Sequence, residues 1–353
     1  MKFFPVMLAN CYILIATFSL LLSACSPPTP PPTRAFYHWQ TALELTTEEV
    51  SFLTQLEVEK LYVKFFDVDW EESLGEPVPL AQVAIQPAEV KGLEIIPTVF
   101  ITNQTMRQLP LEEVSSLAQR ICDKIFELAE PLPDNTIGEI QIDCDWSGQS
   151  RVVYFRLLEA IKTLLKPRDI TLSATIRLHQ VKYSKQTGIP PVDRGMLMFY
   201  NVGQVEDWRE QNSILNLPTA RAYLGNLRQY PLELDLVLPV FAWGVLFRQG
   251  KMIKLINNLR PADLADTSRF HETEANRFEV IKSTYLNGYY LYRGDLIRTE
   301  AIPVDLLQET ITVMKEELPS VKRTLAFYHL DTTTIKHYVY EDLEALFLEM
   351  VQE

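Results

Sequence analysis

Apolar and polar positions along the chain follow two periodicities, one typical of strands and one typical of helices. Short alternating or continuously apolar stretches predict strands at 35–39, 61–66, 93–101, 139–145, 170–178, 195–200, 234–243 and 325–330. Between them apolar residues recur at helical spacing, as in 112–130 and 151–166, and Thr46 with Glu49 predicts a capping box that opens another helix. Eight strand-then-helix units predict a closed (β/α)8 TIM barrel, with a doubly wound open sheet as the alternative.

One stretch breaks this rhythm. About 60 residues separate the strand 234–243 from the helix expected to begin near Val304, which is too long for an ordinary connection. Hairpin-like pieces at 245–256 and 289–302 predict a small α+β insertion after the seventh strand, at about 244–302. Its aromatic run offers a wall for stacking on sugars, although packing between strands is the alternative use for most of these rings: Tyr285, Tyr289, Tyr290 and Tyr292.

The start of the chain has the layout of an export signal. Lys2 precedes an apolar run over 3–22, and the run ends in Leu22-Ser23-Ala24-Cys25, which resembles a bacterial lipobox. We therefore predict a signal peptide at 1–24 and lipid on Cys25. An uncleaved transmembrane helix is the alternative, since a bilayer needs about 20 apolar residues. Ser26-Pro27-Pro28 would end such a helix at once.

A lipidated Cys25 implies a membrane partner reached through the lipid, and an exported, envelope-anchored protein. The proline-rich stretch to residue 34 predicts an extended spacer, followed by the barrel over 35–353. The residue directly after Cys25 is Ser26 rather than an acidic residue, which favours the outer membrane. Cys122 and Cys144 lie in apolar patterns, and we expect buried free thiols there rather than a disulfide.

Charge and glycine content limit the function classes. The formal net charge of -13 disfavours a nucleic-acid partner, because such proteins neutralise phosphates with cations. The chain holds 12 glycines, and we find neither a phosphate-binding glycine loop nor a nucleophile elbow. We therefore expect no nucleotide chemistry and assign no cofactor, and a metal ion enters only in the third function considered below.

The segment 139–145 carries the candidate chemistry. Side chains alternate along a strand, so Gln141, Asp143 and Asp145 share the face opposite Ile140 and Ile142. The polar face is expected to point into the barrel, with Asp143 and Asp145 at its C-terminal mouth, where barrel enzymes keep their active sites. Because burying two carboxylates is costly without partners, these residues are the candidate catalytic pair.

Cations on neighbouring strands are the expected partners. Arg177 and His179 share the inward face of the strand 170–178, and Lys64 lies between Val63 and Phe65. A network of Asp143, Asp145, Lys64 and Arg177 is either a structural salt-bridge cluster or a site in which close carboxylates shift each other's pKa.

Several motifs resemble those of family 18 glycoside hydrolases, the chitinase-like barrels. Ile142-Asp143-Cys144-Asp145-Trp146 is similar to the fourth-strand pattern D-G-I-D-L-D-W-E. Met198-Phe199-Tyr200-Asn201 is similar to M-x-Y-D, and the stretch 238–244 is similar to the proline-aromatic-glycine strand, after which the family tends to carry an α+β insertion.

The resemblance implies roles and also exposes departures. Asp145 matches the aspartate that positions the substrate's N-acetyl group, and Tyr200 matches the tyrosine that assists it. Ser147 stands where the family has its general-acid glutamate, and Ile140 replaces the first aspartate. Serine is no general acid at neutral pH, so the family's own reaction is not expected.

Three functions stay open from the sequence. The first is glycan hydrolysis, with Asp143 or Asp145 facing another carboxylate at ~5–5.5 Å for retention or ~6.5–9.5 Å for inversion. The candidates for that second carboxylate are Asp67, Asp69, Glu71 and Asp331. The second function is a carbohydrate-binding or scaffolding lipoprotein that lost the acid.

The third function is a metal-dependent hydrolase or deacetylase. His38 lies at the end of the first predicted strand and His329 in the last, and these strands are neighbours in a closed barrel, so the two histidines and Asp143 could together bind a metal. Hydrogen bonding to sugars is the alternative use of these histidines. Four tryptophans near strand ends suit a glycan cleft or cap the core: Trp39, Trp70, Trp146 and Trp243.

Overall fold

Eight parallel strands form the centre of this computed structural model, which describes residues 30–86, 92–132 and 137–351. Around the barrel they are β1 (Thr33–His38), β3 (Lys60–Glu71), β6 (Glu94–Ile101), β7 (Glu139–Asp143), β8 (Thr171–Arg177), β9 (Arg194–Met198), β10 (Leu234–Pro239) and β18 (Thr324–Tyr328). Because β1 pairs with both β18 and β3, the sheet closes on itself. The predicted (β/α)8 TIM barrel is confirmed. The predicted signal peptide and Cys25 lie outside the described residues.

Alternation along the strands separates two environments. On β7 and β8, Ile140, Ile142 and Ile176 lie fully buried in the main apolar core, while Gln141 and Thr175 occupy the other face. Burying each of these isoleucines contributes roughly 1.5–3 kcal/mol. The polar residues therefore point into the barrel because the apolar ones are required outside it.

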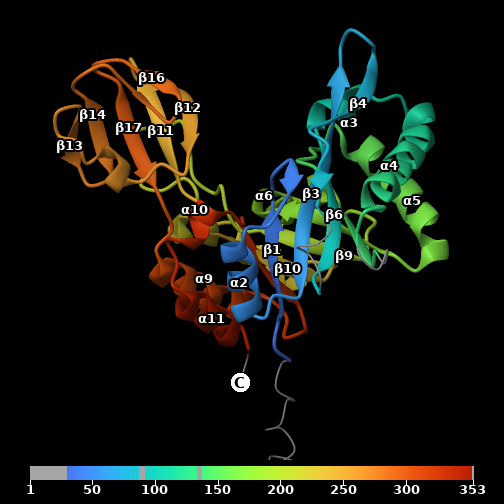
Figure 1. The fold of residues 1–353 in the computed structure, drawn as a ribbon. Helices are drawn as coiled ribbons and strands as arrows, with labels where there is room; N and C mark the ends of the chain where they lie inside the picture. Colours follow the sequence, from blue (N-terminus) through green and yellow to red (C-terminus); the bar gives the residue numbers. More distant parts are fainter. Residues whose placement is uncertain (1–29, 87–91, 133–136, 352–353) are drawn as a thin grey trace, which may run out of the picture.

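Helices surround the barrel, as Figure 1 shows. The longer ones are α2 (Thr47–Gln55), α4 (Val114–Ala129), α5 (Arg151–Leu165), α9 (Val304–Glu317) and α11 (Tyr340–Glu349); the shorter ones are α3 (Asn103–Gln108), α6 (Leu178–Lys182), α7 (Ser184–Thr187), α8 (Leu217–Arg221) and α10 (Thr332–Ile335). The capping box at Thr46 and Glu49 is confirmed. No helix within the described part of the chain combines the length and apolar character needed to cross a bilayer.

Strand β3 extends beyond the barrel. Its end pairs antiparallel with β4 (Glu76–Leu80), and this hairpin projects above the barrel in Figure 1. Two short strands, β2 (Ala42–Leu43) and β5 (Ala84–Ile85), pair in parallel outside the barrel sheet. A bulge between Lys64 and Phe66 shifts the register of β3 against β6.

The insertion forms a second sheet. Its strands β11 (Trp243–Arg248), β12 (Lys251–Asn257), β13 (Phe270–Glu274), β14 (Arg277–Val280) and β17 (Leu296–Glu300) stand in the order β12-β11-β17-β14-β13, and β15 (Thr284–Leu286) pairs with β16 (Tyr289–Leu291). The predicted strand 234–243 is split, because the chain leaves the barrel after Pro239 and enters β11 at Trp243. A separate apolar core that includes Leu246, Phe270 and Ile297 holds the insertion together. The insertion lies above one side of the barrel (Figure 1).

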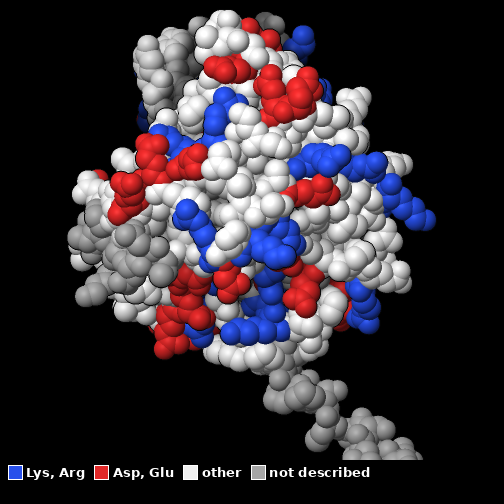
Figure 2. Space-filling view, turned by 90° about the vertical axis from the view of Figure 1, so that its right-hand side faces the viewer, with Lys and Arg blue, Asp and Glu red and all other residues white. Residues whose placement is uncertain are grey.

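Charges on the face that carries α4 and α5 are mixed. Figure 2 shows acidic and basic side chains interspersed there, without a broad field of one sign. The excess of acidic residues in the whole chain is therefore not concentrated on this face.

Candidate site at the barrel mouth

Two adjoining cavities open at the C-terminal ends of the barrel strands. The first has a volume of about 330 Å³ and the second of about 520 Å³. Both are lined by Asp145, Arg177, Tyr200 and Asn201, so these four residues stand at the boundary between them. The residues singled out on the fourth and fifth predicted strands therefore meet at one site.

The two aspartates of the site have different surroundings. Asp143 is 4% exposed and accepts a hydrogen bond of 2.5 Å from the Thr175 hydroxyl. The Asp145 side chain is 53% exposed, and its Oδ1 accepts a 2.7 Å hydrogen bond from Nε of Arg177. Asp143 therefore forms the floor of the first cavity, and Asp145 lies at the surface between the two cavities.

Burial sets the electrostatics of the floor. Burial raises the pKa of Asp143, Arg177 opposes that rise, and the neighbouring charge of Asp145 adds to it. For Arg177, burial would lower the pKa, but interactions with Tyr200, Asp143 and Asp145 outweigh it and the pKa is raised. A permanent cation therefore stands between a buried carboxyl group and an exposed carboxylate.

Aromatic rings line the first cavity in a continuous series. Tyr328 stacks on Tyr200 with centroids 5.2 Å apart and lies 5.9 Å from Trp39 on one side. On the other side Phe241 lies 5.7 Å from Tyr328 and 5.2 Å from Trp243. Flat aromatic faces bind the apolar faces of sugar rings, so this wall suits a carbohydrate.

A buried polar network fixes the far end of this wall. The indole N–H of Trp243 donates to Glu300 Oε2 over 2.8 Å, and the other oxygen of Glu300 accepts from Nε of Arg298 over 2.6 Å. Both members of this ion pair are at most 1% exposed. Ser213 donates to Glu300 through its backbone N–H and its hydroxyl.

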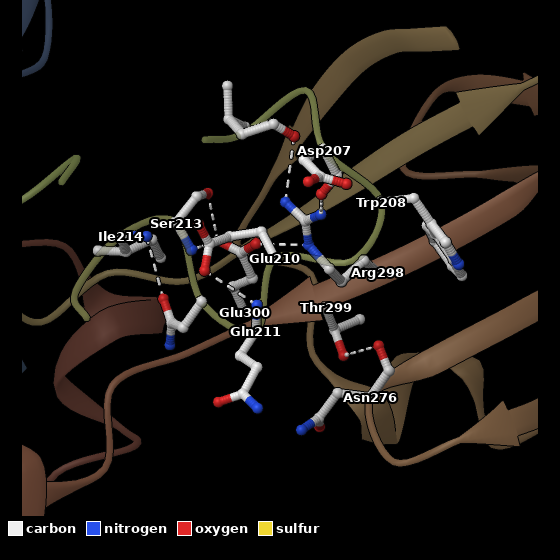
Figure 3. Close-up of polar contacts among 12 residues, drawn as sticks. Asp207, Trp208, Glu210, Gln211, Ser213, Ile214, Asn276, Arg298, Thr299 and Glu300 are labelled. Atoms are coloured by element: carbon white, nitrogen blue, oxygen red, sulfur yellow. Dashed lines mark hydrogen bonds and ion pairs between the residues drawn. The ribbon is translucent and has the colours of Figure 1, made fainter. Parts of the chain in front are cut away.

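The same network reaches the loop that follows β9. Arg298 donates to the backbone oxygens of Val205 and Asp207, and Figure 3 shows Arg298 and Glu300, which lie on β17 of the insertion sheet, beside that loop. The network thus ties Trp243, the insertion and the loop after Asn201 into one unit.

Unsatisfied polar atoms gather at this end of the barrel. Among the described residues, seven buried side-chain atoms have no hydrogen-bond partner. Five of them belong to residues in the upper part of the barrel, at strand ends or, for Asp67, where β3 leaves the barrel: His38, Asp67, Asn103, Arg177 and His329. A buried polar atom left unpaired costs about 1–3 kcal/mol, and three of these residues line the cavities, where a ligand or water can supply the missing partner: Asn103, Arg177 and His329.

The remaining predicted site residues are partly dispersed. The expected four-membered network does not form: Lys64 pairs with Asp67 over 3.2 Å instead, since the bulge in β3 follows Lys64 directly. Neither residue lines either cavity. His179 lies on α6 rather than on the strand, but it lines the second cavity.

The two histidines from the first and last strands lie near each other, as expected from closure. His38 is 2% exposed, and burial together with the influence of His329 lowers its pKa to about 4. His329 lines the first cavity and contacts Asp331 over 3.4 Å. In the part of the chain that the structure describes, no three histidine, cysteine, aspartate or glutamate residues converge as metal ligands.

No third carboxylate faces Asp143 and Asp145 within the described lining of the two cavities. The other candidates have local partners: Asp69 accepts from Thr102, Glu71 from Ser73, and Asp331 caps α10 through Thr334. Ser147, at the position of the expected acid, lines the second cavity, and its backbone N–H donates to Ser150.

The four tryptophans divide between the two expected uses. Trp39 and Trp243 line the first cavity. Trp146 borders the second cavity but is 1% exposed and donates to the backbone of Thr187, as a core residue does. Trp70 packs against the core and borders neither cavity.

Asparagines of the site were not found from the sequence. Asn201 borders both cavities, and Asn257 and Asn258 from the insertion line the first. Asn201 and Asn258 have φ angles of 56° and 57°, a left-handed conformation that asparagine tolerates better than most residues. The doublet Asn257-Asn258 after an apolar strand was the available signal.

Comparison with known proteins places the fold among chitinase-like barrels. No family model matches the sequence, and no curated protein matches it significantly. Solved structures do match in fold. The spore cortex-lytic enzyme SleL of Bacillus cereus has 16% identity and a TM-score of 0.54, covering 92% of this chain and 75% of SleL.

Two further matches are chitinase structures. The C-terminal domain of a putative chitinase from Desulfitobacterium hafniense has 12% identity and a TM-score of 0.58, covering 91% of this chain and 100% of that domain. A class V chitinase from Pseudomonas fluorescens has 11% identity and a TM-score of 0.55, covering 90% and 99%. At these identities the likeness shows the fold of the barrel alone.

Proposed function

We propose that this chain is an envelope lipoprotein whose barrel mouth binds a glycan without hydrolysing it. The observation that carries this proposal is the combination of an aromatic wall with unpaired polar groups around two carboxylates that have no third carboxylate opposite them in the described cavity lining. Aromatic faces and convergent polar groups are what a sugar site requires.

Asp145 is suited to bind a sugar. Its Oδ1 accepts a hydrogen bond of 2.7 Å from Arg177, which holds the carboxylate at the boundary between the two cavities. It is an acceptor for sugar hydroxyl or N-acetyl N–H groups. Asn201 and Asn257 add amides, which both donate and accept.

The test is binding of N-acetylated chito-oligosaccharides, measured by titration calorimetry. We expect the wild type to bind and to release no new reducing ends. Asp145→Asn removes a charged acceptor, for which hydrogen bonds contribute about 1.5–3 kcal/mol, so affinity should fall roughly 10- to 100-fold. The matched control is Asp193→Asn, an exposed carboxylate that pairs with Lys162 and precedes the N-terminal end of β9, the end of the barrel opposite the site, and it should leave affinity unchanged. Equal affinity of Asp145→Asn and wild type would refute the proposal.

Hydrolysis is the second candidate, because the raised pKa of Asp143 favours a carboxyl group that keeps its proton and could serve as an acid. Release of reducing ends by the wild type, abolished in a folded Asp143→Asn variant, would establish this function instead.

The lipoprotein part of the proposal rests on the Leu22-Ser23-Ala24-Cys25 pattern. Incorporation of labelled fatty acid into the wild type but not into Cys25→Ser is the expected result. Equal labelling of both would remove the anchor from the proposal.

A further inference from the structure

A tyrosine face covers the outside of the β15–β16 hairpin. Asn287 and Gly288 form its turn, with φ angles of 48° and 80°, the left-handed pair that an Asn-Gly hairpin turn requires. Alternation then sends Leu291 into the core of the insertion and the neighbouring tyrosines outward. Tyr285, Tyr290 and Tyr292 are 69%, 43% and 51% exposed, with ring centroids 4.9 Å apart along the series.

Tyr285 and Tyr290 are cross-strand partners in the hairpin, yet their rings and that of Tyr292 stay exposed. Their hydroxyl groups have no hydrogen-bond partner among the described residues, and the three rings form one contiguous cluster. Contiguous exposed clusters of large apolar groups mark interaction sites more often than single exposed residues do.

Lysines and arginines are concentrated on the segments that form the tyrosine hairpin or pack beside it. The segments 243–257 and 280–294 contain five lysines and arginines and no acidic residue, in a chain whose net charge is -13. Lys254 lies 3.4 Å from the centre of the Tyr289 ring, and Arg248 lies 4.3 Å from that of Tyr292. Arg248 is paired with Asp295, whereas the other four form no ion pair within the described part of the chain: Lys251, Lys254, Lys282 and Arg293.

Strand β12 connects this region to the barrel mouth. Asn257, at its end, lines the first cavity, and Lys254 lies three residues earlier. A strand rises about 3.3 Å per residue, so the cations begin roughly 10 Å from the cavity rim. A polymer seated in the cavity can therefore reach the hairpin.

Flat aromatic rings with unpaired cations fit a ligand that has apolar ring faces and negative groups. We propose that the tyrosine face and its four unpaired cations form a second binding surface for an acidic polysaccharide, one with carboxylate groups on its sugar rings. This inference rests on the proposed function, because it assumes that the ligand is a glycan that extends from the cavity to the hairpin. An anionic membrane is disfavoured as the ligand. The proposed lipid anchor precedes β1, and β1 begins at the end of the barrel opposite the insertion (Figure 1), so the anchor would place the membrane on the side away from the tyrosine face.

The test uses the full chain in a non-ionic detergent and sodium polygalacturonate as the probe, with affinity electrophoresis as the measurement. We expect binding that weakens with added salt. The double variant Tyr290→Ser, Tyr292→Ser and the double variant Lys282→Gln, Arg293→Gln should each lower the affinity at least tenfold. The matched control is Tyr183→Ser, an exposed tyrosine on the barrel that also lies beside a lysine, Lys182, and it should change nothing.

Two results would overturn the inference. One is polygalacturonate binding that is absent or equal in wild type and both double variants. The other is binding only to mixed micelles that contain phosphatidylglycerol, which would make the surface a membrane contact. The double variant Tyr290→Ser, Tyr292→Ser keeps the affinity of the cavity for a short chito-oligosaccharide that does not reach the hairpin, so failure of the cavity to bind chito-oligosaccharides and failure of this surface are separate outcomes.

Discussion

At the lower end of β7 the carboxylate of Glu139 accepts hydrogen bonds from Lys60, Tyr62 and Ser173, whereas at the upper end of the same strand Asp143 faces a cavity. Glu139 and Asp143 are equally buried, at 4% exposure each. The lower group is enclosed by partners, and the upper one has Thr175 and the influence of Arg177.

The comparison extends beyond this strand. No polar side-chain atom of Lys60, Tyr62, Glu139 or Ser173 is among the buried unpaired atoms of the described residues, while five such atoms lie at the upper end. The polar groups at the lower end therefore have partners within the fold, whereas the upper end carries unpaired buried atoms. This difference agrees with the proposal that the upper end binds a ligand, since each unpaired atom costs about 1–3 kcal/mol.

The largest expected effect tests the lower end. Lys60→Met removes the cation of a pair in which the Glu139 side chain is 5% exposed. Breaking a buried pair leaves an uncompensated charge, and we expect the free energy of unfolding to fall by about 3–5 kcal/mol. Urea denaturation measures this loss, while glycan affinity of the folded protein should not change.

The matched control is Lys124→Met, whose partner Glu127 is exposed, and it should cost less than about 1 kcal/mol. A Lys60→Met variant that keeps its stability but loses glycan binding would reverse the assignment of the two ends.

A pH-dependent effect sharpens the comparison at the upper end. Burial lowers the pKa of His38 from 6.5 to about 4. The folded protein binds this proton less tightly than the unfolded chain, so the contribution of His38 is present above pH 6.5 and is lost as pH falls toward 4. The difference between the unfolded and folded pKa values of His38 corresponds to a loss of about 3 kcal/mol in the free energy of unfolding.

His38→Gln should therefore flatten the decline in unfolding free energy between pH 6.5 and 4, measured by urea denaturation across that range. His271→Gln, on the exposed edge strand β13, is the control and should leave the decline unchanged. An unaltered decline in His38→Gln would show that His38 is not the buried titrating group.

Alternation in the sequence predicted the barrel because each strand must place apolar residues outside and polar residues inside. The same reasoning predicted Asp143, Asp145 and Arg177 at one site, and Tyr200 followed from a family resemblance. It could not predict the pairing of Lys64 with Asp67, which depends on a bulge that only the register of β3 with β6 reveals.

Residues brought by distant segments were also hidden. Asn257 and Asn258 belong to the insertion, and no local pattern states that the insertion folds back to the cavity rim. The support of Trp243 by Glu300 spans 57 positions and depends on how β11 pairs with β17. The tyrosine run was visible in the sequence, but its exposure depends on which face the hairpin turns outward.

The smallest expected effect concerns Thr175, which donates to Asp143 over 2.5 Å. Thr175→Val keeps the shape of the side chain and removes the hydroxyl. That hydrogen bond lowers the pKa of Asp143 against the raising effect of burial, so the variant should raise this pKa further. A raised carboxyl pKa means that the folded state binds the proton more tightly, and the stabilisation is complete below the ordinary pKa and lost as pH rises through the folded value.

We therefore expect Thr175→Val to be less stable than wild type by about 1.5 kcal/mol at pH 7, the lower value for a hydrogen bond to a charged group, with the difference shrinking as pH falls through the raised pKa of Asp143. Urea denaturation at pH 7 and at successively lower pH values measures it. The contribution of the Thr175 hydroxyl is thus lost toward acid, in the same direction as that of His38. A stability difference that stays constant with pH would mean that Asp143 does not titrate in this range. That result would contradict the proposed difference between the two ends of β7.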